Sequence, residues 1–153
     1  AGFYEALKPD FQTYIKNVLA NAKMLAETLK NNGFKIYSGG TDTHLMLVDL
    51  RPFNVKGNLA SESLCRANIT CNKNGIPFDT EKPMITSGIR LGSQAATTRG
   101  FGLKEFEKVG NLITKVIKGL SENPEDNSKI EGEVRDEVVN LCSNFPIYKN
   151  LNK

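Results

Sequence analysis

The sequence predicts an α+β fold in which helices cover one face of a small, mostly antiparallel sheet. Two long segments, 11–29 and 103–120, carry apolar residues at the spacing of amphipathic helices. Short apolar runs of strand length lie elsewhere, bounded by glycine, proline and asparagine. The predicted order is helix, strand, strand, helix, strand, strand, helix, helix. A two-layer sandwich is the simplest packing of that order, because each helical stripe can be buried against one sheet.

The first long helix is predicted from Asp10 to about Asn31. Pro9 suits its start, because the proline ring fixes a helical φ where no N–H donor is needed. Gly33 suits the left-handed residue that commonly follows a helix. The apolar stripe that defines the helix consists of Phe11, Tyr14, Ile15, Val18, Leu19, Ala22, Leu25, Ala26 and Leu29.

Four short segments are predicted as strands. Residues 34–37 alternate between apolar and polar side chains before a glycine pair ends the strand. Residues 45–50 form an almost continuous apolar run, which predicts a central strand buried on both faces. Shorter runs at 69–71 and 89–91 predict the other two strands.

Three further helices complete the predicted fold. A short helix is predicted at 57–67 and a second long one at 103–120. Ser128 and Glu131 have the spacing of a capping box, which predicts the start of a last helix. That helix extends through Cys142 and ends before the Phe-Pro pair that follows. The predicted buried side of the short helix is formed by Leu59, Leu64 and Ala67.

The composition indicates a folded globular chain. Of its 153 residues, 39% are hydrophobic and 24% are charged, and the net charge is only +3. The sequence has no basic block with interleaved aromatic residues, so it does not indicate a nucleic-acid partner. It also has no apolar run of the ~18 residues that a membrane span needs. Three scattered cysteines predict reduced thiols in a cytosolic compartment. With one histidine and no metal-ligand spacing, no metal site is expected.

The segment Thr86–Ser93 places an arginine among glycine, serine and threonine. Ile89 and Leu91 predict a short strand with both side chains on one face, so Arg90 between them faces the other way. The planar guanidinium of an arginine can bind a carboxylate or a phosphate through two parallel hydrogen bonds. A surface salt bridge is the alternative, and the spacing alone does not separate the two.

A long segment rich in glycine, asparagine and proline, Asn72–Ser87, contains little that predicts regular structure. Loops of this length inside a compact domain are usually functional. Gly39–Thr41 is a second glycine-rich candidate, for a phosphate cradle. No helix is predicted directly after it, so a tight turn is the favoured interpretation.

Four polar motifs occur in order along the chain. They are Gly-Gly-Thr-Asp-Thr-His-Leu at 39–45, Asn-Lys-Asn-Gly-Ile-Pro at 72–77, Ser-Gly-Ile-Arg-Leu-Gly at 87–92 and Thr-Thr-Arg-Gly at 97–100. In sequence and spacing they resemble the serine hydroxymethyltransferase family, whose members are pyridoxal-phosphate enzymes of the aspartate-aminotransferase fold type. The resemblance covers nearly the whole chain but only the C-terminal part of that enzyme. It implies that residues 1–153 are a single small C-terminal domain, without the larger cofactor-binding domain.

The resemblance also implies an activity and a set of site residues. The family enzyme interconverts serine and glycine and transfers a one-carbon unit to tetrahydrofolate, with pyridoxal phosphate as cofactor. By resemblance, Arg90 holds the substrate carboxylate, while Asn74 and the turn Lys82, Pro83, Met84 belong to the folate site. Family members often have serine and phenylalanine where Lys82 and Met84 stand.

The family's Schiff-base lysine follows a Thr-His pair in a threonine-rich segment, which this chain lacks. We therefore expect no catalytic residue and no bound cofactor in the isolated chain, which is predicted to be inactive. The complete enzyme is expected to be a cytoplasmic homodimer.

Two alternatives remain open. A free-standing module could capture small carboxylates through Arg90, and another pyridoxal-phosphate enzyme, such as a threonine aldolase, could contain a related domain. The Asn-Lys-Asn loop favours the transferase, since the aldolase has no folate to bind.

The remaining polar residues have structural interpretations. His44 is expected to be a hydrogen-bonded structural histidine, and Asp42 and Asp49 to be turn and strand-end residues. Arg99 is expected in a structural or inter-domain ion pair. The cysteines Cys65, Cys71 and Cys142 are expected to be small core residues.

Overall fold

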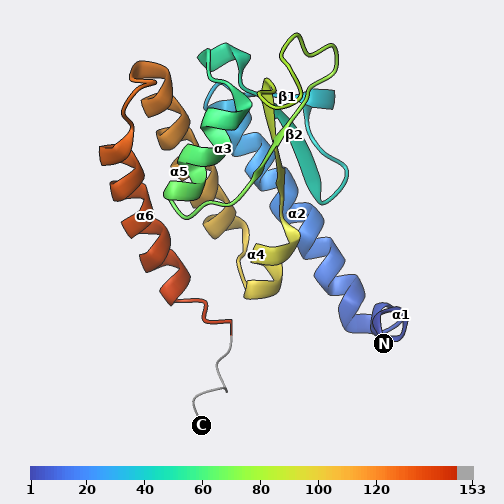
Figure 1. Cartoon of the computed structure of the whole chain (residues 1–153). Helices are drawn as coiled ribbons and strands as arrows, with labels where there is room; N and C mark the ends of the chain where they lie inside the picture. Colours follow the sequence, from blue (N-terminus) through green and yellow to red (C-terminus); the bar gives the residue numbers. More distant parts are fainter. Residues whose placement is uncertain (148–153) are drawn as a thin grey trace.

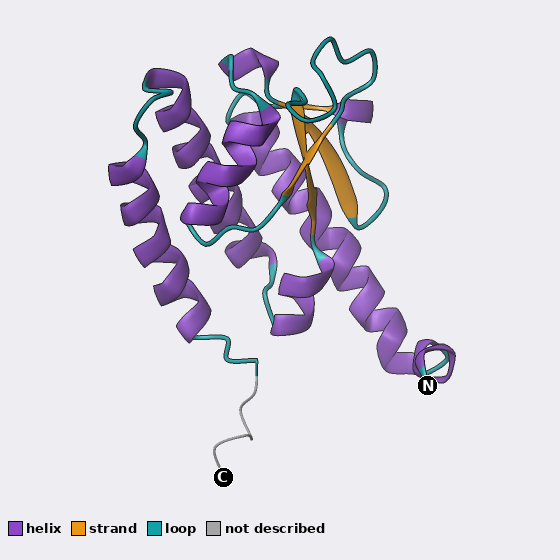
Figure 2. Cartoon of the chain, viewed as in Figure 1, coloured by secondary structure: helices purple, strands orange, loops and turns teal. Residues whose placement is uncertain are grey.

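The computed structural model describes residues 1–147 and has the predicted α+β fold (Figure 1). Its helices cover one face of a four-stranded sheet (Figure 2). Each helix in this part of the chain is too short or too polar to cross a membrane. The helices are α1 (Gly2–Ala6), α2 (Pro9–Asn31), α3 (Gly57–Arg66), α4 (Gln94–Arg99), α5 (Leu103–Glu122) and α6 (Ser128–Ser143), with 3₁₀ turns at Tyr37–Gly39 and Arg51–Phe53. The strands are β1 (Lys35–Ile36), β2 (Leu45–Asp49), β3 (Asn72–Asn74) and β4 (Gly88–Gly92).

The sheet has the order β1-β2-β4-β3, and every neighbouring pair is antiparallel. The central strands β2 and β4 pair along their whole length, although they are far apart in sequence. Their register places Leu47 opposite Arg90, and β3 adds Asn72 on the other side of Arg90. The middle of the sheet therefore brings together three of the segments singled out in the sequence.

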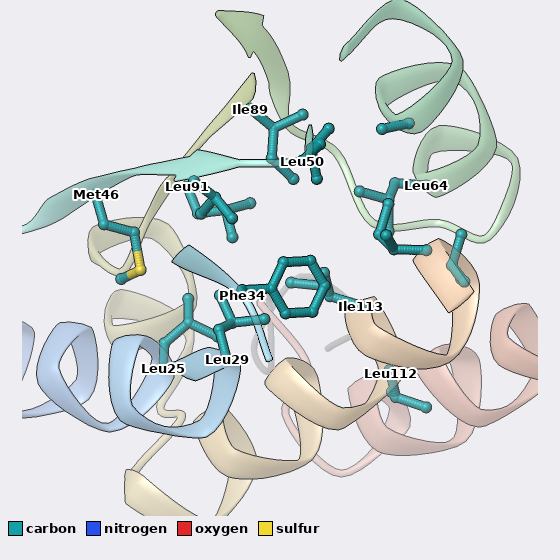
Figure 3. Packing of buried hydrophobic residues seen from close by; sticks show 14 of the residues in the cluster. Leu25, Leu29, Phe34, Met46, Leu50, Leu64, Ile89, Leu91, Leu112 and Ile113 are labelled. Carbon is teal, nitrogen blue, oxygen red and sulfur yellow. The ribbon is translucent and has the colours of Figure 1, made fainter. Parts of the chain in front are cut away.

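The hydrophobic core lies between the inner face of the sheet and the helices (Figure 3). Met46 and Val48 of β2 and Ile89 and Leu91 of β4 are buried on that inner face. Burying a side chain of this size typically stabilises a fold by ~1.5–3 kcal/mol, so this layer fixes the sheet on the helices. The helical side of the core includes Leu25 and Leu29 of α2, Leu64 of α3, and Ile113, Val116 and Ile117 of α5.

The prediction that the central strand is buried on both faces is wrong. Met46 and Val48 are at most 2% exposed, whereas Leu45 and Leu47 are only partly buried. Helices cover one side of the sheet only, so alternate residues of β2 face outward. Leu45 and Leu47 therefore form an apolar outer surface beside Arg90.

Two other details of the prediction need correction. The strand predicted at 69–71 lies at Asn72–Asn74 instead, because that is where the backbone pairs with β4. Leu59 is 39% exposed and does not belong to the buried side of α3. The buried stripe on this side consists of Ala60, Leu64 and Ala67, which follow the helical spacing of three and four residues, and Leu59 lies beside that stripe.

The first helical stripe is buried over its second half. Phe11, Ile15 and Leu19 are only partly buried. The buried apolar residues of α2 are Val18, Ala22, Leu25, Ala26 and Leu29. Figure 1 shows the reason: the N-terminal turns of α2 extend beyond the sheet and the other helices. The stripe of α5 is buried along most of its length, but Leu103 at its start is 46% exposed.

The last helix begins at Ser128 as predicted, but the predicted capping box does not form. Glu131 is 5% exposed, and its carboxylate accepts hydrogen bonds from Nε and Nη2 of Arg66, both at 2.7 Å. The hydroxyl of Ser63 donates to the same carboxylate at 2.6 Å. Glu131 therefore ties α6 to α3 instead of capping its own first turn. These Arg66 hydrogen bonds lower the pKa of Glu131, while burial opposes them and Ser63 adds to them.

Candidate functional site

Arg90 lies in the middle of β4 on the sheet face turned away from the helices. Ile89 and Leu91 are 0% and 6% exposed, and Arg90 between them is exposed. The alternation along the strand thus directs the guanidinium outward, as predicted. Leu47 and Asn72 flank it on the two neighbouring strands.

Two glycines keep the surroundings of Arg90 open. Gly88 and Gly92 lie two residues before and after it on the same face of β4, so no side chain crowds the guanidinium along its own strand. At Gly88 a Cβ would lie 2.6 Å from Cγ2 of Ile76 and 2.7 Å from the carbonyl oxygen of Val48. Only glycine therefore lets the loop 75–87 pack this closely against the end of β4.

Within residues 1–147, Arg90 is the arginine whose guanidinium has neither an ion pair nor a hydrogen bond. Arg51 and Arg66 bind carboxylates, whereas Arg99 and Arg135 donate to backbone carbonyls. The surface salt bridge that the sequence left open for Arg90 does not form in this part of the chain. All five N–H donors of its planar fork remain free for another group.

The carboxylate of Asp79 holds the loop 75–87 closed. Its Oδ2 accepts the N–H of Ile76 at 3.1 Å and of Ser87 at 2.9 Å. Its Oδ1 accepts the Glu81 N–H at 3.0 Å and the Ser87 hydroxyl at 2.7 Å. Burial tends to raise the pKa of Asp79, but the hydrogen bonds, those of Ser87 foremost, outweigh it and lower the pKa. The sequence analysis missed this residue. Aspartate in a loop commonly accepts a hydrogen bond from the backbone N–H two residues later, and this tendency is the signal that could have identified Asp79.

Two further contacts support the same loop from the sheet. The Tyr37 hydroxyl donates to the carbonyl oxygen of Pro77 at 3.4 Å, and Nη2 of Arg51 donates to the Tyr37 hydroxyl at 3.2 Å. Arg51 is in turn fixed by Asp49, which is 1% exposed. Further along the loop, Glu81 forms an ion pair with Lys56, which directly precedes α3. The loop is therefore held at several points along its length.

The predicted folate residues lie at the start of this loop and within it. Asn74 ends β3, and its Nδ2 donates to the Gly75 carbonyl oxygen at 2.8 Å, which leaves Oδ1 without a donor among residues 1–147. Lys82, Pro83 and Met84 form an exposed turn, closed by two backbone hydrogen bonds to the carbonyl of Lys82. Met84 is 74% exposed. The turn thus presents a cation and an apolar side chain to the outside.

An open hollow of about 750 Å³ lies between α2 and the segment 37–43 that leads into β2. Leu47, which lies opposite Arg90, is part of its wall, together with Tyr37 and Pro77. The glycine-rich segment 39–41 forms another part of the wall, and β2 follows it without an intervening helix. Its Thr41 hydroxyl donates to the Leu45 carbonyl oxygen at 2.7 Å and accepts the Thr43 N–H at 3.1 Å, so the segment folds as a turn held by its own side chain.

Arg99 has a structural role, but the predicted ion pair is absent from the described residues. Its Nε donates to the carbonyl oxygen of Phe145 at 2.7 Å, and Nη2 donates to that of Cys142 at 3.1 Å. The guanidinium therefore satisfies carbonyls at the C-terminal end of α6. His44 is partly buried; its backbone carbonyl accepts the Ser93 N–H at 2.9 Å, and its ring has no hydrogen bond within residues 1–147.

The cysteines match their prediction only in part. All three are free thiols, but Cys65 is exposed, so it is not a core residue. Cys71 and Cys142 are partly buried against the core. Burial raises the pKa of the Cys71 thiol to about 11, which keeps it protonated and unreactive at neutral pH.

The described residues do not fit a pyridoxal-phosphate centre. A lysine that forms a Schiff base is normally desolvated, and none of the lysines in residues 1–147 is buried. The same stretch contains no cluster of histidine, cysteine or carboxylate side chains that could hold a metal ion. What the face around Arg90 offers is recognition: a planar cation that has no ion pair within residues 1–147, and a loop beside it that is held at several points.

Comparison with known proteins identifies the family. The model of the family "Serine hydroxymethyltransferase" matches residues 1–113. A serine hydroxymethyltransferase of Pelagibacter ubique is 86% identical over 151 residues, which is 99% of this chain but 35% of that protein. Those of Marinomonas sp. and Paramagnetospirillum magneticum are 64% and 62% identical over 96% of this chain. The chain thus spans about a third of the length of these relatives, and it belongs to the serine hydroxymethyltransferase family.

Proposed function

We propose that this chain is the small C-terminal domain of an enzyme that interconverts serine and glycine and transfers a one-carbon unit to tetrahydrofolate. The observation that carries the proposal is the unpaired Arg90 on the open face of the sheet. The printed name of the relatives, serine hydroxymethyltransferase, supports the substrate and the transferred group. The larger cofactor-binding domain belongs to the remainder of the protein.

In this proposal Arg90 binds the carboxylate of serine or glycine. A carboxylate and a guanidinium are both planar, so two parallel hydrogen bonds fix the rotation of the amino acid as well as its position. The partly buried Leu47 lies opposite Arg90 on β2 and offers an apolar surface beside the guanidinium. A lysine in place of Arg90 would supply the charge without the planar fork.

The segment 74–84 would form part of the folate site. Folate combines a ring system with hydrogen-bonding edges, an aromatic amide and an acidic tail. Asn74 offers a free side-chain oxygen, Met84 an exposed apolar side chain, and Lys82 an exposed cation for the acid groups. These three chemical features fit such a ligand.

Pyridoxal phosphate would be held by the rest of the protein, and when bound it withdraws electrons from the α-carbon of the amino acid. This chain would contribute substrate orientation through Arg90, and we expect no activity from it in isolation. For the whole protein we propose a cytoplasmic homodimer.

The proposal can be tested with a full-length chain in which residues 1–153 replace the matching segment of the Pelagibacter ubique relative, which is 86% identical. We expect glycine to form from serine at a rate that rises strongly when tetrahydrofolate is added. Cleavage of threonine that is faster than the serine reaction and indifferent to folate would instead identify an aldolase. Loss of both reactions, in a chimera that folds and retains its cofactor, would contradict the proposal.

A further inference from the structure

Phe78 combines an almost fully exposed aromatic side chain with an unusual backbone conformation. It is 98% exposed, more than any other large hydrophobic residue that the structure describes. Its backbone has a φ of 58°, in the left-handed region that bulky residues rarely adopt. An aromatic residue in this conformation carries strain of ~1–3 kcal/mol, and such strain concentrates at functional sites.

The backbone around Phe78 is firmly held. The residue before it, Pro77, accepts a hydrogen bond from Tyr37, and the residue after it, Asp79, makes the four hydrogen bonds that close the loop. The ring therefore projects into solvent from a fixed backbone, so a ligand that binds it does not have to order the loop. An exposed aromatic ring on a held backbone is an efficient contact for a planar ligand.

We propose that Phe78 is a further folate-contact residue, whose ring packs against an aromatic ring of tetrahydrofolate. This inference rests on the folate site proposed above, to which it adds one residue. The argument is the chemistry of the loop: it presents an aromatic ring at Phe78, a cation at Lys82 and a flexible apolar side chain at Met84, all exposed. A ligand that is aromatic in its body and acidic at its end satisfies all three. A protein surface packed on the same ring is the competing occupant.

The test uses the full-length chimera loaded with pyridoxal phosphate, and it measures equilibrium binding of 5-formyltetrahydrofolate by calorimetry. Phe78→Asn removes the ring, and asparagine tolerates the left-handed φ of this position. Phe78→Tyr keeps an aromatic ring there. Met84→Ala probes the proposed folate turn independently. Val139→Asn, at a 55% exposed apolar position on α6, is the matched control for removing an exposed hydrophobe.

We expect Phe78→Asn to raise the Kd about three- to tenfold, the usual effect of one aromatic contact. Phe78→Tyr should stay within about twofold, and Val139→Asn should have no effect. The KM for tetrahydrofolate should rise with the Kd while the KM for serine stays constant. The thermal midpoint of Phe78→Asn should be unchanged or higher, because the strain at this residue is relieved.

The other outcomes separate this inference from the function on which it rests. If Met84→Ala weakens folate binding and Phe78→Asn does not, the role of Phe78 is wrong and the folate site stands. If neither variant weakens binding, the proposed folate site itself fails. An unchanged Kd with a lower thermal midpoint or a dissociated oligomer would show that Phe78 packs against protein, and would overturn the inference.

Discussion

Breaking the Arg66–Glu131 ion pair from its two sides should have unequal effects on stability. Glu131 has a side-chain exposure of 6%, whereas that of Arg66 is 55%. Without Arg66, the carboxylate stays buried with Ser63 as its remaining donor. Without Glu131, the guanidinium can turn into water. The cost should therefore depend on which partner is removed.

The expected magnitudes follow from these exposures. Removing one partner of a fully buried ion pair typically costs 3–5 kcal/mol. Because the guanidinium is half exposed and already hydrated, we expect a smaller loss than this for Arg66→Met, about 2–3 kcal/mol of unfolding free energy. Glu131→Gln keeps the shape and leaves no buried charge, so about 1 kcal/mol is expected. Urea unfolding of the 153-residue chain, followed by circular dichroism, measures both values.

The unfolding free energy should also depend on pH, in a direction set by the pKa of Glu131. The pKa of Glu131 is lowered in the folded chain, so its stabilisation is complete above the ordinary glutamate pKa of ~4.3 and is lost as the pH falls below it. In Arg66→Met, burial should outweigh the remaining Ser63 hydrogen bond and raise the pKa of Glu131, so acidification should remove part of the penalty. The stability difference between the two proteins should therefore shrink from pH 7 to pH 4.

Glu133→Gln is the matched control, since Glu133 lies on the same helix and pairs with Lys115 at the surface. It should change the unfolding free energy little, because both partners are exposed. Equal losses for Arg66→Met and Glu131→Gln, or a difference that widens towards acid, would refute the reasoning from burial.

Three further outcomes are expected. Leu25→Ala should cost ~2–5 kcal/mol of unfolding free energy, because Leu25 is 2% exposed, whereas Leu19→Ala should cost less than half of that; equal losses would mean that both ends of α2 are equally buried. Asp79→Asn should make the loop 75–87 cleavable by protease. Acidification should do the same to the unaltered chain only well below the ordinary carboxyl pKa of ~4, because the pKa of Asp79 is lowered; equal resistance of variant and unaltered chain at neutral pH would contradict the role of the four hydrogen bonds. The isolated chain should show no aldimine absorbance band that survives gel filtration and then vanishes on borohydride treatment, and a stoichiometric band of that kind would show that one of its lysines holds the cofactor.

The elements set by local pattern could be predicted from the sequence. The helix that begins at Pro9 and ends before Gly33 has a strong apolar period and recognisable ends, and the structure has it within one residue of the prediction. The outward direction of Arg90 follows in the same way, because strand alternation is a local property. Such features depend on neighbours a few residues away.

Features that depend on distant partners could not be predicted. Glu131 has the spacing of a capping box, but Arg66, 65 residues earlier, provides a better partner for its carboxylate. The β3 strand contains two asparagines, which are poor strand formers, and forms because β4 lies alongside it. Leu47 faces outward because only one side of the sheet carries helices. The rigidity of the loop around Phe78 likewise depends on Tyr37, from another part of the chain.

The central claim is that Arg90 binds the substrate carboxylate, and replacing it with lysine in the full-length enzyme tests that claim most directly. We expect Arg90→Lys to lower kcat/KM for serine by about tenfold to several hundredfold, since a charge-assisted bidentate pair is worth ~1.5–3 kcal/mol or more. Pyridoxal-phosphate content should not change, and Arg135→Lys on the exposed side of α6 should behave like the unaltered enzyme. Near-normal serine turnover in Arg90→Lys would contradict the account.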